Sequence, residues 1–313
     1  MKDVLKTPIV NLGNFENNEM FAKIEGLNLY GSMKDRCAKY VIKKLFATGE
    51  INKDTLIIES SSGNMAVALA MICKKFGLKF CAVIDPSIAP INEFLIKQAG
   101  ADIIKVEKPD ENNSYLKSRL SIVNKMLNEN NNSYWFNQYG NPLVREAYCN
   151  TLGKEIFEQM PDVDYLFMAV SSLGTIAGVC EAIKKHKSKT KIIAIDIEGS
   201  KIFDTNTHAK KHIPGIGSSI IGKHLEFINI DDNLIVPEKE ILNGCLTLVS
   251  DFGLFVGGSS GACFEGAKKY LKLKQVENKK VLCVFADRGE RYFDTIYNKE
   301  WQKCILKEEE WDI

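Results

Sequence analysis

The chain has 313 residues, of which 45% are hydrophobic and 26% are charged. This composition is typical of a folded protein long enough for two domains, and it excludes a mainly disordered chain. The 41 basic and 40 acidic residues nearly cancel, and the sequence contains no DNA- or RNA-binding motif. We therefore expect no nucleic acid partner.

The cysteines and the N-terminus indicate the compartment. Nine cysteines form no Cys-x-x-Cys pair and lie mostly in apolar runs, which predicts free thiols in the cytoplasm. The segment Met1 to Lys6 lacks the apolar core of a signal peptide, and no 18 apolar residues follow one another. We expect neither secretion nor a membrane partner.

Strand and helix patterns alternate along most of the chain. The first half predicts strands at 20–23, 55–58, 79–84 and 102–106, helices from Lys34 and at 65–76, 91–98 and 115–127, and a short segment at 134–136. The second half predicts helices at 143–159, 176–185, 238–249, 260–271 and from Glu290, strands at 165–170, 191–197 and 280–285, and an irregular stretch at 198–225. Repeated βα units of this kind form mostly parallel sheets covered by helices.

Lys34 lies where a predicted turn at 30–32 becomes a predicted helix. The apolar residues from Ala38 to Phe46 recur at helical spacing, so the helix has a buried face. An amine in partly apolar surroundings loses some of its preference for the charged form, and the neutral amine can form a Schiff base. A lysine at this place is also commonly a solvated cation, so this segment alone leaves both interpretations open.

Four polar loops follow predicted strands, where ligands bind in an open α/β sheet. Residues 59–64 suit a carboxylate, although a serine that caps the next helix is the simpler reading. Residues 171–175 are typical of a phosphate loop at a helix N-terminus but lack the lysine of a P-loop. Residues 257–261 permit close approach of the backbone, and residues 286–292 follow the last predicted strand.

The loops belong to a larger set of motifs. Seven motifs occur in order: Thr-Pro-Ile-Val from Thr7, Gly-Ser-Met-Lys-Asp-Arg from Gly31, Ser-Ser-Gly-Asn from Ser61, Asn-Gln-Tyr-Gly-Asn-Pro from Asn137, Gly-Ile-Gly from Gly215, Gly-Gly-Ser-Ser-Gly from Gly257 and Gly-Glu-Arg-Tyr from Gly289. Through them the chain resembles, over almost its full length, the cysteine synthase and cystathionine β-synthase family of fold-type-II pyridoxal-phosphate (PLP) enzymes.

The resemblance implies an architecture. It is a two-domain α/β fold in which each domain has a mostly parallel sheet covered by helices, as in the β-subunit of tryptophan synthase. The small domain is expected at 35–136, and the large PLP-binding domain at 1–34 and 137–313. A homodimer is also implied.

The resemblance also implies a role for each matching residue. Lys34 would bind PLP covalently and later move protons. Asn64 would donate a hydrogen bond to the phenolic oxygen of PLP, and Ser259 would face its pyridine nitrogen. The phosphate would be held by Ser171, Ser172, Gly174 and Thr175. The substrate would be held by Ser61, Ser62, Gln138, Tyr139, Arg119 and Gly215.

The implied role of Ser259 favours one reaction class. A serine cannot keep the pyridine nitrogen protonated as a carboxylate would, so the ring is a weaker electron sink. Elimination of a β-leaving group, which gives an α-aminoacrylate, is then favoured over transamination. Addition of a nucleophile completes a β-replacement on an activated L-serine.

Departures from the family pattern bear on the substrates. Cysteine synthases have Gly-Thr-Gly-Gly-Thr where this chain has residues 171–175, and family members usually have Phe at the position of Tyr139. Together with residues 85–90, 115–119, 201–203 and 287–289, these departures are most similar to the siderophore-pathway branch. That branch includes N-(2-amino-2-carboxyethyl)-L-glutamate synthase, which joins O-phospho-L-serine to L-glutamate and releases phosphate. Leu173 departs from this branch as well.

The sequence is also compatible with three other functions. One is a cysteine synthase that uses O-acetylserine or O-phosphoserine with sulfide. Another is a thiol-using relative such as cystathionine or lanthionine synthase. A third, from another class, is a non-catalytic α/β scaffold or binding protein.

Arg119 and the pair His208 and His212 can each be interpreted either as solvated surface residues or as parts of a site. O-phosphoserine and glutamate both bring additional negative charge, for which Arg119 on the predicted helix at 115–127 is our candidate cation. An arginine on a helix face is equally often solvated. His208 and His212 have the spacing of metal ligands, but without a third ligand nearby we expect a solvated loop and no metal.

Overall fold

The computed structural model describes residues 6–109, 115–207 and 209–309. Clustering of the backbone divides the chain into two compact units, Met1–Met33 with Val144–Ile313, and Lys34–Leu143. We call them the large unit and the small unit. The expected boundaries, 35 and 136, lie one and seven residues from these positions.

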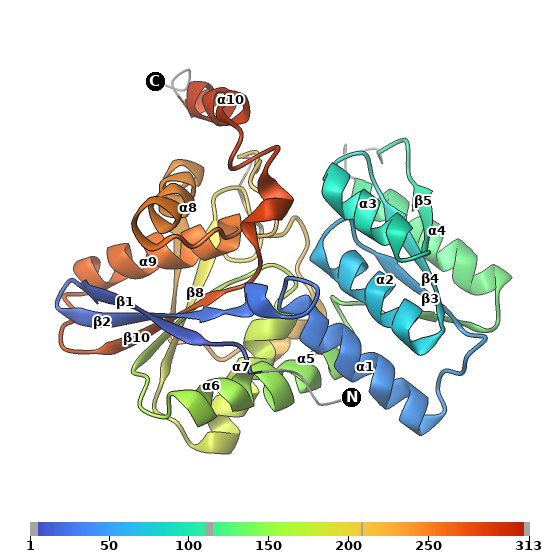
Figure 1. The fold of residues 1–313 in the computed structure, drawn as a ribbon, viewed down its shortest axis with the longest axis horizontal. Coiled ribbons are helices and arrows are strands. Elements are labelled where there is room, and N and C mark those ends of the chain that lie inside the picture. Colours follow the sequence, from blue (N-terminus) through green and yellow to red (C-terminus); the bar gives the residue numbers. More distant parts are fainter. Residues whose placement is uncertain (1–5, 110–114, 208, 310–313) are drawn as a thin grey trace. The chain divides into compact units, whose positions relative to one another are not determined.

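The large unit contains a six-stranded sheet of order β1-β2-β10-β7-β8-β9 (Figure 1). Its strands are β1 (Ile9–Phe15), β2 (Asn18–Ile24), β7 (Tyr165–Ala169), β8 (Lys191–Ile197), β9 (Asp232–Val236) and β10 (Lys280–Phe285). Only β1 runs antiparallel to its neighbour, and the other pairs are parallel. The mostly parallel sheet confirms the α/β prediction for this unit.

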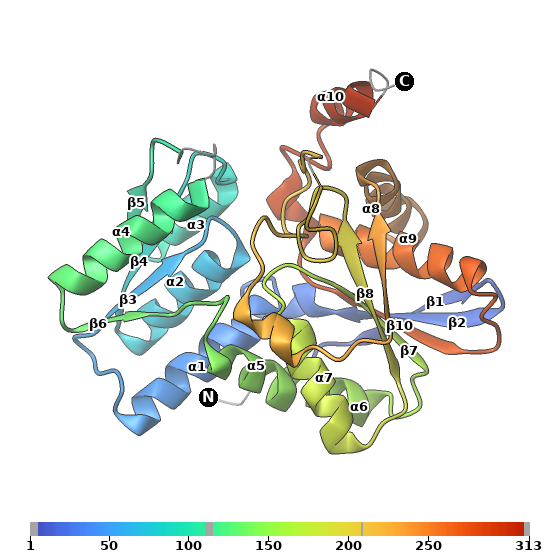
Figure 2. The same ribbon diagram turned by 180° about the vertical axis from the view of Figure 1, so that it is seen from behind.

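Helices cover both faces of this sheet. The α-helices are α5 (Pro142–Tyr148), which begins in the small unit, α6 (Lys154–Gln159), α7 (Gly174–His186), α8 (Glu238–Phe252), α9 (Gly258–Leu273) and α10 (Lys299–Glu309). In both views α8 and α9 lie on one face, and α6 and α7 lie on the other (Figures 1 and 2). One core cluster of this unit contains side chains from all six strands and from α8 and α9.

The small unit contains a four-stranded, fully parallel sheet of order β5-β4-β3-β6. Its strands are β3 (Leu56–Ser60), β4 (Lys79–Ile84), β5 (Asp102–Lys105) and β6 (Ser133–Trp135). Its helices are α1 (Lys34–Thr48), α2 (Asn64–Phe76), α3 (Pro90–Gln98) and α4 (Tyr115–Glu129). In Figure 2, α4 lies on the opposite face of the sheet from α2. Because every strand points the same way, the loops that follow β3, β4 and β6 share one edge.

Two strands were missed, and two predicted helices are wrong. Strands β1 and β9 were not expected, because β1 carries a bulge near Gly13 and β9 begins with the polar pair Asp232 and Asn233. The helix expected at 143–159 is interrupted by a π-helical turn, Cys149–Gly153, between α5 and α6. The helix expected from Glu290 is a short 3-10 turn, Gly289–Tyr292, and the last helix begins only at Lys299.

The described residues also bear on the cysteines, on membrane-spanning helices and on metal ligands. The eight cysteines whose side chains the structure describes are buried and free, as predicted. Across the described residues, no helix is both long and apolar enough to span a bilayer. The same residues contain no group of three side chains placed to hold a metal ion. His208 lies outside the described residues, and His212 Nδ1 lies 2.8 Å from Glu238 Oε2.

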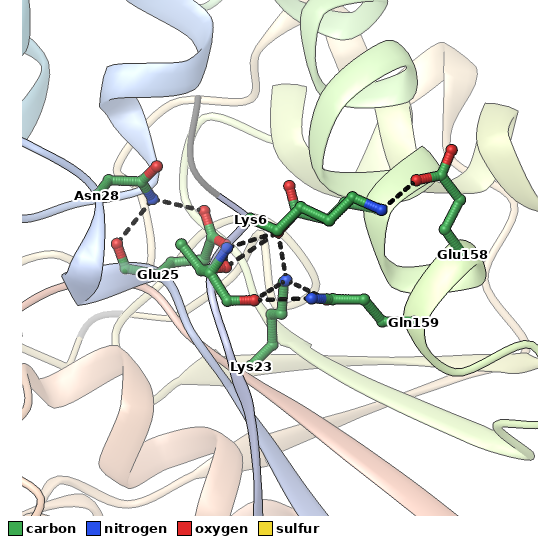
Figure 3. Close-up of polar contacts among 8 residues, drawn as sticks. Lys6, Lys23, Glu25, Asn28, Glu158 and Gln159 are labelled. Atoms are coloured by element: carbon green, nitrogen blue, oxygen red, sulfur yellow. Dashed lines mark hydrogen bonds and ion pairs between the residues drawn. The ribbon is translucent and has the colours of Figure 1, made fainter. Parts of the chain in front are cut away.

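A buried polar cluster holds the N-terminal segment against the large unit (Figure 3). Lys23, on β2, is fully buried, and its Nζ donates to the Thr7 carbonyl at 2.7 Å, to Glu155 Oε1 at 2.5 Å and to Gln159 Oε1 at 2.5 Å. Glu155 also accepts the Thr7 backbone N–H at 2.8 Å. A buried ammonium is tolerated only where acceptors replace the lost water. The cluster therefore joins β2 and α6 to the first described residues.

We expect Glu155→Ala to lower the free energy of unfolding by about 3–5 kcal/mol, since it removes a carboxylate that lies 2.5 Å from the buried Lys23 ammonium. Urea unfolding measures the change. The matched control is Glu158→Ala on the same helix, whose carboxylate pairs with Lys6 at the surface, with side chains 37% and 58% exposed. Surface pairs contribute little. Equal losses for the two variants would contradict the structural role of the Lys23 cluster.

Candidate active site

In the large unit, the predicted phosphate loop follows β7 and opens α7. Leu173 has a left-handed backbone, with φ of 65°, and its side chain is buried. The Ser171 hydroxyl donates to the Gly217 carbonyl at 3.0 Å, and the Gly217 N–H donates to the Val170 carbonyl at 2.7 Å. The phosphate loop is therefore tied to the Gly215-Ile216-Gly217 segment.

The hydroxyls in this loop fit a phosphate. Ser172 and Thr175 are 5% and 6% exposed, and within the described chain neither hydroxyl has a hydrogen-bond partner. Thr175 lies in the first turn of α7, and Ser172 lies two residues before the helix begins, where the N-terminal N–H groups attract anions. Hydroxyls that the fold leaves without a partner can donate hydrogen bonds to such an anion. The donor set is therefore suited to the phosphate of PLP.

A second part of the large unit lies at the start of α9. Ser259 is 5% exposed in its first turn. A Cβ added to Gly257 would lie 2.2 Å from Asp287 Oδ1, and one added to Gly258 would lie 2.4 Å from Ile213 Cγ2. The backbone before Ser259 thus packs too closely against the ends of other segments for any side chain.

Tyr292 connects the remaining large-unit segments. Its hydroxyl donates to Asp287 Oδ2 at 2.5 Å. The same hydroxyl would lie 3.1 Å from a Cβ added to Gly215, whose φ is 87°. The structure thus brings Gly215, Ser171 and the start of α9 into one network of close contacts at the carboxyl ends of parallel strands.

Lys34 is the first residue of α1, as the helical spacing predicted, and it is half-buried. The preceding residue, Met33, donates its N–H to the Ala286 carbonyl at 2.9 Å. One turn later, burial raises the pKa of the Cys37 thiol to about 12, and the charge of Lys34 acts against this rise. The Cys37 thiol therefore stays protonated and serves in packing. Lys34, one turn earlier, is the candidate nucleophile.

In the small unit, the loop after β3 meets the loop after β4. Asn64 is the first residue of α2, and Ser61 is 8% exposed. The Ser62 Oγ accepts the Asp85 backbone N–H at 3.3 Å and Arg119 Nη1 at 3.3 Å. Ser62 is therefore held between the ends of two parallel strands and helix α4.

Arg119 is not solvated. Its side chain is 14% exposed, and Nη1 lies 3.2 Å from Asp85 Oδ2, on a side chain that is 7% exposed. Its Nε is buried and has no hydrogen-bond partner within the described chain. The interpretation of Arg119 as a solvated cation on a helix face is wrong. The guanidinium instead carries its charge, partly balanced by Asp85, to the edge where Ser62 lies.

Gln138 lies beside a carboxylate for which no role was predicted. Glu59, near the end of β3, is 1% exposed and accepts the Asn137 N–H at 2.8 Å and Gln138 Nε2 at 3.2 Å. Burial is the largest effect on Glu59 and raises its pKa to about 8 against these hydrogen bonds. Burial also raises the pKa of Tyr139.

The candidate residues fall into two sets, one in each unit. The large unit contains Ser171, Ser172, Gly174, Thr175, Gly215 and Ser259. The small unit contains Lys34, Ser61, Ser62, Asn64, Arg119, Gln138 and Tyr139. Sequence analysis assigned no role to Glu59 or Asp85. The position of Glu59 at the end of an otherwise apolar strand could have indicated a role, because a carboxylate is buried only where partners are provided.

The chain is similar to known proteins along nearly all of its length. Residues 1–287 match the family model described as pyridoxal-phosphate dependent enzyme. Two relatives are named N-(2-amino-2-carboxyethyl)-L-glutamate synthase. The one from Ralstonia nicotianae is 38% identical and covers 94% of this chain and 88% of its own. The one from Cupriavidus metallidurans is 37% identical and covers 96% and 90%.

A solved structure has the same fold. It is the O-acetylserine dependent cystathionine β-synthase of Helicobacter pylori, with a TM-score of 0.86 and 28% sequence identity. The alignment covers 94% of this chain and 96% of that one.

We expect Thr175→Val to weaken PLP binding by roughly 10- to 100-fold, the equivalent of about 1.5–3 kcal/mol for a hydrogen bond to a charged group. Titration of the apoprotein with PLP, followed by absorbance, measures the affinity. Thr190→Val is the matched control, because the Thr190 hydroxyl donates to the Val163 carbonyl at 2.7 Å away from the phosphate loop. It should lower stability and leave PLP affinity unchanged. An unchanged affinity in Thr175→Val would remove this residue from the phosphate site.

Proposed function

Because the chain belongs to the family of pyridoxal-phosphate dependent enzymes, we propose that it joins O-phospho-L-serine to L-glutamate, giving N-(2-amino-2-carboxyethyl)-L-glutamate and phosphate. The observation that carries this proposal is the identity of 38% to a relative of that name over 94% of the chain. The chemistry is a β-replacement. A Cβ–O bond to phosphate breaks, a bond from Cβ to the glutamate nitrogen forms, and that nitrogen loses a proton.

The cofactor and Lys34 divide the chemistry between them. When bound, PLP supplies the electron sink that allows the leaving group to depart from Cβ and the nucleophile to add there. The Nζ of Lys34 holds the cofactor in the resting enzyme, takes the proton from the substrate Cα, and returns a proton to Cα of the product. Lys34 lies half-buried at the first residue of α1, where its primary amine can serve as the covalent anchor.

Residues of the large unit orient the cofactor. Ser171, Ser172, Gly174 and Thr175 bind its phosphate at the N-terminus of α7. Ser259 faces its pyridine nitrogen as a neutral hydroxyl, and Gly215 lies on the segment tied to the phosphate loop.

Residues of the small unit bind the amino-acid substrates. Asn64 binds the phenolic oxygen of the cofactor, and Ser61, Ser62 and Gln138 bind the substrate carboxylate. Arg119 and Tyr139 supply a cation and a hydroxyl for the additional negative charge of phosphoserine or glutamate. The contact between Arg119 and Ser62 supports this assignment, because it directs a guanidinium to the serine loop.

The main rival is a cysteine synthase or a thiol-using relative. The fold shared with an O-acetylserine dependent cystathionine β-synthase supports that rival, at a lower identity of 28%. We further propose that the protein works as a homodimer in the cytoplasm, in a siderophore pathway. The buried free cysteines support the cytoplasmic assignment, and the family resemblance drawn from the sequence motifs supports the other two.

Lys34→Ala should abolish turnover and leave the fold intact, because it removes the covalent anchor and the proton carrier together. Borohydride reduction of the native holoenzyme, followed by peptide mapping, should place the cofactor on the peptide that contains Lys34. Lys43→Ala, an exposed change on the same helix, should remain active and keep the label on Lys34. A label on any other lysine would overturn the assignment.

Arg119→Ala should weaken the use of O-phosphoserine or glutamate by roughly 1.5–3 kcal/mol, the range for hydrogen bonds to charged groups. The reaction of O-acetylserine with sulfide should lose much less. Steady-state kinetics with both substrate pairs measure the difference, and Lys125→Ala, whose side chain is 68% exposed on the same helix, serves as the control. Equal losses for both pairs would indicate that Arg119 only neutralises Asp85.

A further inference from the structure

Glu59 is a buried carboxyl that contacts a proposed substrate-binding residue without belonging to the proposed machinery itself. It is 1% exposed. Its Oε2 accepts the Asn137 N–H and its Oε1 accepts Gln138 Nε2. Asn137 has a left-handed backbone, with φ of 53°. Glu59 thus anchors the turn that presents Gln138 after β6.

The charged and titratable groups around Glu59 come from three other segments. Arg119 on α4 favours the ionised form of Glu59, but burial disfavours it more strongly. Tyr139 is buried close enough to be affected by the charge of Glu59, and so is Cys37 on α1. With its pKa raised to about 8, Glu59 changes protonation state near neutral pH.

An ionised Glu59 can bind only the N–H end of the Gln138 amide, whereas a protonated Glu59 can bind either end. An ionised carboxylate only accepts hydrogen bonds, so it must face Nε2, as in this structure. A protonated carboxyl donates from its own O–H and can face Oε1 instead. The amide then turns over and presents both N–H groups on its other side. An amide N–H is the end that binds a carboxylate, whereas Oε1 repels it.

We propose that Glu59 is a positioning residue whose proton sets the orientation of the Gln138 amide, and thereby controls how tightly the carboxylate of the amino-acid substrate is bound. The inference rests on the proposed function in assigning that carboxylate to Gln138. The neutral carboxyl gives the binding-competent orientation, and the ionised carboxylate gives the weaker one.

The test compares the native holoenzyme with Glu59→Gln and Glu59→Ala. Glutamine is neutral at every pH, and it can accept from Asn137 while donating to Gln138 Oε1. For the native enzyme we expect the KM for O-phosphoserine to rise several-fold between pH 7 and pH 9, with a smaller change in kcat. Glu59→Gln should lack this additional rise, and Glu59→Ala should have a high KM throughout. Identical pH profiles for the native enzyme and Glu59→Gln would overturn the proposal.

A binding measurement separates this inference from the proposed function. L-alanine has the carboxylate but no β-leaving group, and its dissociation constant can be read from the cofactor absorbance. In the native enzyme, L-alanine should bind more weakly as the pH rises. In Glu59→Gln, its affinity should change only as much as the titration of alanine itself requires. If alanine follows this pattern and no glutamate adduct forms, only the proposed function fails. If alanine binds the two proteins identically at every pH, the role of Glu59 fails.

Thermal unfolding checks that Glu59 titrates as its burial requires. The pKa of the folded protein, about 8, lies above the ordinary value of 4.5, so ionisation is costlier when folded. The contribution of Glu59 to stability is therefore greatest below pH 4.5 and falls as the pH rises toward 8. Relative to the native protein, Glu59→Gln should gain in Tm between pH 5.5 and pH 8.5. A constant difference in Tm would show that Glu59 is ionised throughout and would overturn the proposal.

Discussion

The parallel direction of the strands is the constraint on which the rest of the structure depends. In each unit the carboxyl ends of parallel strands reach one edge, and there the chain leaves the buried sheet for polar loops. Most buried side chains of the strands are apolar, although Lys23 on β2 and Glu59 near the end of β3 are exceptions. Polar groups therefore gather where the strands end. This is why loops far apart in the sequence, such as those after β3 and β6, become neighbours.

Polar groups at such an edge are only partly exposed to water, so each one needs a hydrogen-bond partner in the protein or in a ligand. The structure meets this need with short hydrogen bonds inside each unit. Ser171 is tied to Gly217, Arg119 is paired with Asp85, and Glu59 holds the turn at Gln138. Within the described chain the hydroxyls of Ser172 and Thr175 have no such partner, which leaves them available to a phosphate.

The pairing of Arg119 with Asp85 also affects specificity. A bare guanidinium would attract any anion, whereas a paired one keeps its directional N–H groups and little net charge. Recognition then depends on geometry, which suits the choice between a phosphate and a second carboxylate. Glu59 limits the net charge in a similar way, since a neutral carboxyl places no negative charge beside the proposed site for carboxylates.

Much of this arrangement was predictable from the sequence, and the reasons for the exceptions are physical. The spacing after Lys34 placed the start of α1 correctly, because a one-sided apolar stripe has few other solutions. Strand β9 was missed because it is only five residues long and begins with Asp232 and Asn233, and because its pairing with β8 is a tertiary effect. The burial of Arg119 was equally invisible, since its partner Asp85 lies 34 positions earlier and meets it only in the fold.

The central claim is that the nitrogen of glutamate replaces the phosphate on Cβ of phosphoserine. The most direct measurement is to incubate the holoenzyme with O-phospho-L-serine and 15N-labelled L-glutamate, with sulfide and cysteine supplied in parallel reactions. We predict one phosphate released for each product, and a product in which the 15N atom is bonded to the former Cβ. Rapid formation of cysteine from sulfide, with no adduct that contains 15N, would contradict the claim and identify a cysteine synthase.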